Sequence, residues 1–281
     1  MKTGLIAATL KNPDYSAYVT IHFPISDEEL SEKLSYVEFD KDCVTADCCV
    51  GNVEGDVPAL KGLIGTTVNV DELNYLAKRL DSFGGDELPK FNAVVTAKKL
   101  TSMKDLINLT FNMGNYTLVT DFSDLAKIGF NNYMDIHGSI SVQEKEKMDF
   151  VIMGEQLIGS GDGKTTPYGV VYRNDITVYD LYDGKHLPAY AYTSDFVFAA
   201  GIQNKNIRND PYKTEWLYLP CSDLTIKKAM NRLGVEDFGD VEVAEYDFNL
   251  EFPESCFKYI ESNVDLATLN EMCAAIKKNG R

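Results

Sequence analysis

Hydrophobic and polar positions follow a strand-like pattern at the start of this chain. Residues 18–25 (YVTIHFPI) are rich in β-branched and aromatic side chains, and the shorter segment 43–50 alternates, so both predict strands. Between them, Ser26 and Glu29 have the spacing of a capping box, and two leucines one turn apart give the following helix an inward face. Residues 1–68 are therefore predicted to form a small α+β domain.

From residue 69 the period becomes helical. Asn69 and Glu72 form a second capping box, and the apolar residues that follow have the spacing of one helix face: Leu73, Leu76, Ala77 and Leu80. Gly84-Gly85 ends this helix, and three more helices are predicted to start at about Asp86, after Ser102 and near Asp121. Residues 69–131 are predicted to be a domain of four short helices.

The next segment, residues 132–205, has a different composition. It is rich in Tyr, Val, Phe, Gly and Pro, as in YGVVYRNDITVYDLYDG, with turn signals at Pro167 and Asp183-Gly184. We therefore predict a β-rich domain here. The polar stretch 201–214 indicates a loop or linker before the last segment.

The last segment, residues 206–281, resembles the first. WLYLPCSDLTIKKAMNRLGV echoes VTIHFPISDEELSEKL, and YIESNVDLATLNEMCAAI echoes LIGTTVNVDELNYLAKRL, both at one offset of 196 residues. The identities are few, including Pro24 with Pro220 and Asn74 with Asn270, but the order of strand, Pro, cap, helix and later helix repeats. We predict an α+β unit that repeats residues 20–80. The acids are not repeated, because Glu28, Glu29 and Glu32 align with Leu224, Thr225 and Lys228.

Charge narrows the choice of function. The chain has 43 Asp and Glu against 27 Lys and Arg, a net charge of −16. Affinity for phosphate comes from Lys and Arg, so the balance argues against direct binding to nucleic acid or to anionic membranes. No apolar run approaches the ~18 residues of a membrane helix, and the N-terminus lacks the apolar core of a signal peptide. We expect a soluble cytoplasmic protein.

No catalytic constellation stands out. Residues 159–165 (GSGDGKT) resemble a phosphate-binding loop, but the first Gly required by that motif is replaced by Ile158, and Pro167 follows where a helix should begin. His22, His137 and His186 are far apart in sequence, and the six cysteines form no CxxC pair. We expect no enzyme, metal or cofactor, with a nucleotide-processing enzyme built on residues 159–165 as an alternative.

Acidic residues cluster in the first hundred positions. Some lie in first helical turns, where the helix dipole favours them, but others fall in predicted loops and strands. Carboxylates one helical turn apart have Cβ atoms ~5–6 Å apart, comparable to the spacing of phosphates, so an exposed stripe would present a DNA-like field. The candidates for such a surface are Asp27, Glu28, Glu29, Glu32, Glu38, Asp40, Asp42, Asp47, Glu54, Asp56, Asp71, Glu72, Asp86 and Glu87.

The sequence also resembles a known family across nearly its whole length. Six stretches carry the resemblance to ArdA antirestriction proteins, in the longer form of Gram-positive conjugative transposons and other mobile elements: FPISDEELSEKL (23–34), VNVDELNYLAKRLDSF (68–83), LTSMKDLINLTFN (100–112), TPYGVVY (166–172), LYDGKHLPAY (181–190) and WLYLP (216–220). Shorter members have an α+β domain, a helical middle domain and a third α+β domain, and form elongated acidic dimers. The region beyond residue 131 is longer here, and the repeat-like ending departs from the short members.

The resemblance implies a function that needs no active site. It implies a homodimer that mimics DNA and occupies the DNA-binding groove of type I restriction-modification enzymes. An acidic module against another basic DNA-binding target, such as a CRISPR effector, is an alternative with the same physics.

Overall fold

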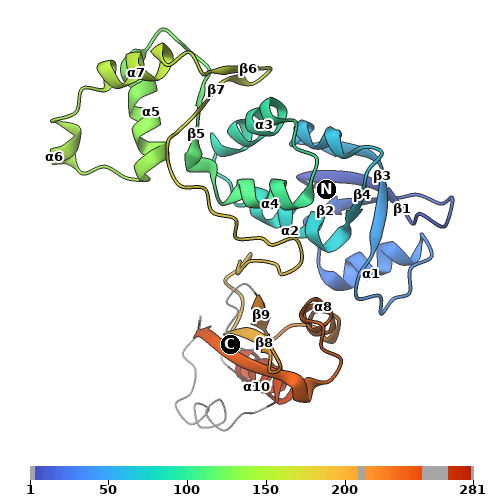
Figure 1. The fold of residues 1–281 in the computed structure, drawn as a ribbon. Coiled ribbons are helices and arrows are strands. Elements are labelled where there is room, and N and C mark those ends of the chain that lie inside the picture. Colours follow the sequence, from blue (N-terminus) through green and yellow to red (C-terminus); the bar gives the residue numbers. More distant parts are fainter. Residues whose placement is uncertain (1–3, 208–212, 249–264, 280–281) are drawn as a thin grey trace.

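The chain has an α+β fold built from helices and small antiparallel sheets (Figure 1). The computed structural model describes residues 4–207, 213–248 and 265–279. Cys256 and two residues of the predicted repeat, Ile260 and Val264, lie outside the described residues. Figure 1 shows an arc, with a helical lobe at one end, the N-terminal unit in the middle and the C-terminal unit at the other end.

The N-terminal unit, residues 4–81, is a four-stranded antiparallel sheet with two helices. The sheet has the order β2-β1-β3-β4, with β1 at Ile6–Lys11, β2 at Val19–Phe23, β3 at Asp47–Gly55 and β4 at Thr67–Asn69. Helix α1 (Asp27–Ser35) follows β2, and a 3-10 turn η1 (Pro58–Leu63) precedes α2 (Val70–Asp81). Ser26 and Asn69 cap the two helices as their sequence predicts.

The hydrophobic core continues from this unit into the next helices. Helices α3 (Glu87–Lys98) and α4 (Met103–Thr110) contribute to the same cluster of buried side chains as the N-terminal sheet. Phe91 and Ile107, for example, are as fully buried as Ile21. The predicted boundary at residue 68 therefore passes through one core.

The following part differs from the four-helix prediction. After a 3-10 turn η2 (Met113–Asn115), strand β5 (Tyr116–Val119) joins β6 (Lys164–Thr166) and β7 (Gly169–Arg173) in a sheet of order β5-β7-β6. The fourth helix, α5 (Leu125–His137), begins at Leu125 because Asp124 caps it, later than the predicted start near Asp121.

The prediction of a β-rich domain over residues 132–205 is wrong for its first part, which is a helical lobe (residues 125–159). Helices α6 (Val142–Lys145) and α7 (Phe150–Gly159) follow α5 there. Gly129 and Gly154 explain why a segment rich in Val, Ile and Phe forms a helix here. They let α5 and α7 cross in backbone contact, since a Cβ on Gly129 would lie 2.0 Å from the carbonyl oxygen of Phe150.

A strap without helix or strand, residues 174–197, leads from the lobe to the C-terminal unit. Asparagine side chains of α4 and η2 hold it by its backbone. Asn108 accepts from the N–H of Tyr182 and donates to its carbonyl, and Asn112 does the same for Tyr179, at 2.7–2.9 Å. Asn115 donates to the carbonyl of Ile176. These bonds replace the sheet ladder that the composition of this segment predicts.

The C-terminal unit is built from residues 198–207, 213–248 and 265–279. Its sheet has the order β10-β8-β9, with β8 at Phe198–Asn204, β9 at Glu215–Leu219 and β10 at Val241–Phe248. Helix α8 (Asp223–Leu233), a 3-10 turn η4 (Phe238–Asp240) and α10 (Leu266–Asn279) complete it around a separate core. The first four residues of the stretch predicted as a loop over 201–214 belong to β8, and residues 208–212 of it lie outside the described residues.

The two units share details that go beyond strand order. Asn74 hydrogen bonds both the N–H and the carbonyl of Ile25, and Asn270 makes the same two bonds to Cys221, at 2.9–3.0 Å. Ser26 and Ser222 cap α1 and α8 identically, and Phe23-Pro24 and Leu219-Pro220 are both cis. The third strand bulges at the same place, with Gly51 and Ala244 as extra residues. The sequence repeat therefore has a counterpart in backbone geometry.

Candidate functional site

Helix α1 presents three carboxylates to solvent. Leu30 and Leu34 pack into the core, so Glu28, Glu29 and Glu32 lie on the exposed side. Glu28 and Glu32 are one helical turn apart, which brings like charges close together. None of the three forms an ion pair with a described residue.

The acidic surface continues into the loop after α1 and along β3. Glu38, Asp40 and Asp42 are exposed in that loop. Asp47 and Glu54 are exposed at the two ends of β3, where each accepts only an amide hydrogen bond, from Asn69 and Asn52 at 3.0 Å, and Asp56 is exposed just beyond it. Within the described residues, none of these acids has a Lys or Arg partner. Their charges therefore remain available to a partner.

Two candidates lie elsewhere. Asp86 is exposed ahead of α3, and Glu87 in its first turn accepts the N–H of Gly84 at 2.8 Å. Helix α3 lies away from α1, next to the sheet of β5, β6 and β7 (Figure 1). The acids of residues 27–87 do not form one continuous stripe, because α3 turns this pair to another side of the protein.

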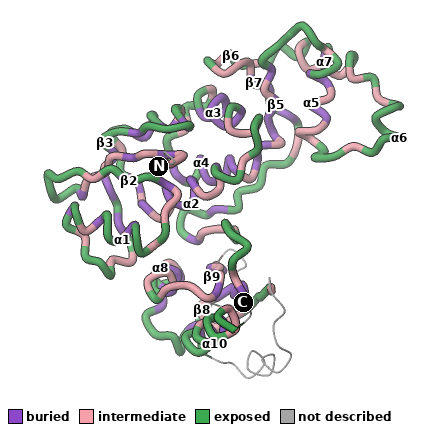
Figure 2. Tube along the Cα trace, turned by 180° about the vertical axis from the view of Figure 1, so that it is seen from behind, coloured by how far each residue is buried: buried purple, intermediate pink, exposed green. Residues whose placement is uncertain are grey.

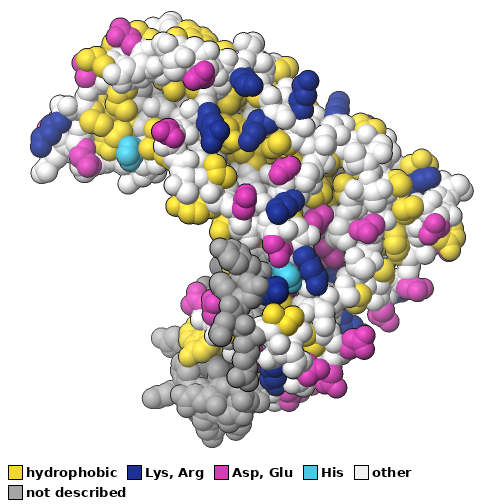
Figure 3. Space-filling model, in the orientation of Figure 1, with side chains coloured by type: hydrophobic (Ala, Val, Ile, Leu, Met, Phe, Trp, Pro, Cys, Tyr) yellow, Lys and Arg dark blue, Asp and Glu magenta, His cyan; other side chains and the backbone are white. Residues whose placement is uncertain are grey.

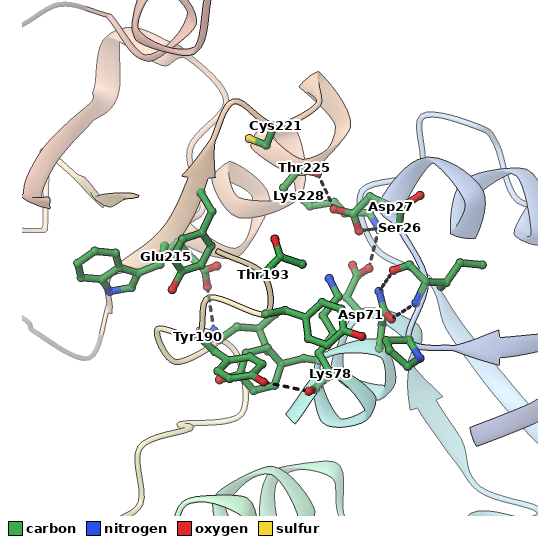
Figure 4. Close-up of a pocket in the computed structure, with 18 of the residues that line it drawn as sticks. Ser26, Asp27, Asp71, Lys78, Tyr190, Thr193, Glu215, Cys221, Thr225 and Lys228 are labelled. Atoms are coloured by element: carbon green, nitrogen blue, oxygen red, sulfur yellow. Dashed lines mark hydrogen bonds and ion pairs between the residues drawn. The ribbon is translucent and has the colours of Figure 1, made fainter. Parts of the chain in front are cut away.

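Three candidates are not surface groups. Asp27 and Asp71 both bind Lys228 of α8, at 3.1 and 2.6 Å from its Nζ, and Asp27 also accepts a hydrogen bond from Thr225 at 2.6 Å. Glu72 accepts a hydrogen bond from the hydroxyl of buried Tyr182. Asp27 and Asp71 therefore lie at the junction between the N-terminal and C-terminal units (Figure 4), and Glu72 contacts the strap.

The junction is a network of compensated charges. Burial raises the pKa of Asp27, but Lys228 and Thr225 outweigh it, so the net pKa shift is downward. For Lys228, burial lowers the pKa, and the two aspartates raise it more. Buried Glu215 accepts from Arg232 at 2.8 Å and from the N–H of Leu187 at 3.0 Å, while burial keeps its pKa above the ordinary value.

A cavity of about 530 Å³ lies at this junction. Its walls come from α2, the strap, β9 and α8, and they carry tyrosines and Trp216 beside the charged groups. Figure 4 shows Asp27 and Asp71 beside Thr225 and Lys228 of α8, with Thr193 of the strap between the two units. The acids and bases of this cavity mostly pair with each other, so it is a docked interface between units.

A second group of acids on the C-terminal unit was missed in the sequence. Glu242, Glu245 and Asp247 lie on strand β10, and Asp240 directly precedes it. The strand register makes Asp240 the counterpart of Asp47 and Asp247 the counterpart of Glu54. The available signal was the segment EDFGDVEVAEYD (236–247), which contains six acids and no base.

The other chemical candidates lie apart from one another. The Gly-rich residues 159–165 lead from α7 into strand β6, so they do not open a helix as phosphate binding requires. Buried His186 pairs with Asp183 at 2.6 Å, far in sequence from exposed His22 and from His137 at the end of α5. Within the described ranges, no His, Cys, Asp or Glu cluster is arranged to hold a metal ion.

Cys43, Cys48, Cys49 and Cys221 are free thiols. Burial raises the pKa of the Cys48 and Cys221 thiols to about 12, which disfavours the reactive thiolate.

Comparison with protein-family models and with curated proteins finds no match. Among the helices of the described residues, none is both long and apolar enough to span a membrane.

Proposed function

We propose that this protein is a DNA mimic that inhibits type I restriction-modification enzymes by occupying their DNA-binding groove. The observation that carries the proposal is the set of unpaired carboxylates on α1, its following loop and β3. Figure 3 shows Asp and Glu side chains at intervals along one edge, from the N-terminal unit onto the C-terminal unit. The resemblance to ArdA proteins indicates the class of target, type I restriction-modification enzymes. These enzymes act inside the cell, so we propose that this protein is cytoplasmic.

The binding energy of such an inhibitor is distributed over many charged groups. Each exposed carboxylate that meets a Lys or Arg contributes only ~0.2–1 kcal/mol, so no single acid should dominate. A folded array has one advantage over DNA, because its curvature is built in and needs no bending energy. Binding should weaken steeply with salt, as expected for exposed charges.

A matched pair of triple variants tests this proposal. Glu28→Gln, Glu29→Gln and Glu32→Gln together should weaken inhibition strongly and reduce its salt dependence. The control is Asp162→Asn, Asp175→Asn and Asp180→Asn, which removes the same charge from exposed positions outside α1, its following loop and β3, and outside the lobe. The measurement is cleavage of unmodified DNA by a type I enzyme, titrated with each variant at two salt concentrations. Equal loss in both triples would mean that net charge, and not this surface, determines inhibition.

The same titration against other basic DNA-binding enzymes identifies the target. Inhibition of a CRISPR effector, with no effect on the type I enzyme, would support DNA mimicry but would show that the target is a different enzyme. Nucleotide binding that Lys164→Ala abolishes would instead support an enzyme. A single exposed-acid substitution that eliminated inhibition in a folded protein would contradict the distributed mechanism.

We also propose that the protein forms a homodimer through the helical lobe. Helix α7 has six large apolar side chains in ten residues and one charge, Glu155, and its one buried residue is Gly154 (Figure 2). Ile152 of α7 and Val142 of α6 are 49 % and 76 % exposed. A surface of low charge suits self-association in a chain of net charge −16. Sedimentation should show a dimer at micromolar concentration, and Val151→Ser with Ile152→Ser should shift it to monomer.

A further inference from the structure

The junction places a base where the repeated unit has an acid. Helices α1 and α8 begin at equivalent positions, so Lys228 corresponds to Glu32 and Thr225 corresponds to Glu29. On α1 these positions are exposed, whereas on α8 they face the N-terminal unit and bind its carboxylates. Helix α8 therefore has a docking surface at the positions where α1 has an acidic, exposed surface.

Lys228 makes the most buried of these contacts. Its side chain is 6 % exposed, and Asp27 and Asp71 are 18 % and 11 % exposed in the same ion pairs. Asp27 lies at the start of α1 and Asp71 at the start of α2. One ammonium therefore joins α8 to both helices of the N-terminal unit, while Lys78 and the Arg232–Glu215 pair face the same cavity.

The two acidic strands are carried by the two units that Lys228 joins. Strand β3 carries Asp47 and Glu54, and β10 has Asp247 and the preceding Asp240 at equivalent positions. Each strand is fixed in its own sheet, so only the junction determines the distance and angle between them. A partner that contacts both strands would bind best if that angle is set in advance, because less entropy is lost on binding.

We propose that Lys228 is a positioning residue that holds the acidic strands β3 and β10 at the relative placement that the partner recognises. This inference rests on the proposed function. It makes a prediction opposite in sign to that of a simple charge effect. Removing Lys228 makes the protein more acidic, so if only net charge counted, inhibition would improve. If Lys228 positions the units, inhibition falls although the acidic surface itself is untouched.

The test compares Lys228→Met with Lys227→Met, a neighbouring lysine of α8 that is exposed and has no described partner. Both changes remove one positive charge. Lys227→Met should inhibit at least as well as the parent protein, whereas Lys228→Met should need at least tenfold more protein for half inhibition. Lys228→Arg should restore most of it, because a guanidinium can also bridge two carboxylates.

Small-angle X-ray scattering supplies a readout independent of inhibition. Lys228→Met should broaden the distance distribution of the intact protein, while Lys227→Met should leave it unchanged. Far-ultraviolet circular dichroism reports whether the variant stays folded, because Trp216 lines the junction cavity and its fluorescence would also respond to a loosened junction. If Lys228→Met unfolds, the triple variant Asp27→Asn, Asp71→Asn, Lys228→Met removes the junction charges without leaving any unpaired, and it should show the same broadening and loss.

The outcomes separate the two proposals. If Lys228→Met changes the scattering but even the parent protein does not inhibit, Lys228 still holds the two units together and the proposal of DNA mimicry is wrong. Full inhibition by folded Lys228→Met, or scattering identical to the parent, would overturn the positioning role while leaving mimicry intact.

Discussion

The N-terminal and C-terminal units have the same backbone frame and opposite helix surfaces. Both use a serine cap, an asparagine that brackets the segment before the helix, and a bulge in the third strand. Their helices differ, since α1 exposes Glu28, Glu29 and Glu32 where α8 has Leu224, Thr225 and Lys228. The frame depends on a few polar side chains that bind backbone, so the outward positions are free to change.

The outward-facing acids differ in how far they are repeated between the strands and between the helices of the two units. The acids at the ends of β3 have counterparts at the ends of β10, whereas the exposed acids of α1, Glu28, Glu29 and Glu32, have none on α8. A second acidic helix at the junction would place more carboxylates beside Asp27 and Asp71, where like charges repel. Lys228 at this position turns repulsion into a buried ion pair. Docking of the two copies therefore explains why only part of the acidic surface is repeated.

Exchanging the divergent positions gives the largest expected effect. Lys228→Glu should destabilise the protein by about 3–5 kcal/mol, because it leaves three carboxylates in a buried site. The reciprocal change, Glu32→Lys, lies on the exposed face of α1 and should alter stability by only about 0.5 kcal/mol or less. Urea unfolding of both variants, followed by circular dichroism, measures the difference. Equal destabilisation would mean that the two helices are not as different in environment as the structure shows.

The asparagine brackets give the next largest effect. Asn74→Ala and Asn270→Ala each leave a backbone N–H and a carbonyl without their partner, at a cost of about 1–3 kcal/mol for each unsatisfied group that is buried. Asn74 is buried and Asn270 half-buried, so the N-terminal variant should lose more stability.

The single tryptophan separates the two units in this measurement. Trp216 lies in β9, so its fluorescence follows the C-terminal unit, while circular dichroism follows the whole chain. Asn270→Ala should lower the urea midpoint of the fluorescence transition, and Asn74→Ala should act mainly on the circular dichroism. A bracket that could be removed from either unit without loss would show that other contacts determine the shared frame.

The parts of this comparison that the sequence predicts are local. Ser26 and Asn69 precede helices whose starts follow from side-chain bonds within three residues, so the caps could be placed from the sequence. The strap could not, because Asn108 holds Tyr182, which lies 74 positions further along, and no periodic pattern marks such a bond. Helix α7 was missed because its Val, Ile and Phe residues favour a strand, and its two-glycine crossing depends on α5.

The candidate site was predictable to the same extent. The acids of α1 and β3 are exposed, and their clustering in the sequence pointed to them. Asp27, Asp71 and Glu72 looked the same in the sequence, yet their environment is set by Lys228 and Tyr182 from more than a hundred residues away. The acids of β10 could have been found from the sequence alone, because they also cluster, in the second half of the chain. Hydrophobic periodicity in the sequence does not show how the two repeated units dock on each other.

Acid titration of the junction gives the smallest effect and tests whether the ion pairs of Lys228 stabilise the fold. The pKa of Asp27 is lower when folded than when unfolded, since Lys228 and Thr225 outweigh its burial. Its ionised form therefore stabilises the protein above about pH 4, the ordinary range of an Asp, and this stabilisation is lost as pH falls through the lower folded pKa. Asp27→Asn removes that contribution, which we expect to be on the order of 1 kcal/mol at neutral pH.

The informative quantity is the stability gap between the parent protein and Asp27→Asn. Glu72 and Glu215 have raised pKa values because they are buried, and protonation of these groups favours the folded state as pH falls. They are present in both proteins, as are Asp71, Lys78 and Lys228, so their contributions largely cancel in the gap. Urea midpoints measured from pH 7 to pH 3 should show the gap closing below about pH 4. A gap that stayed constant over this range would mean that Asp27 contributes through packing or its bond to Thr225, and not through its charge on Lys228.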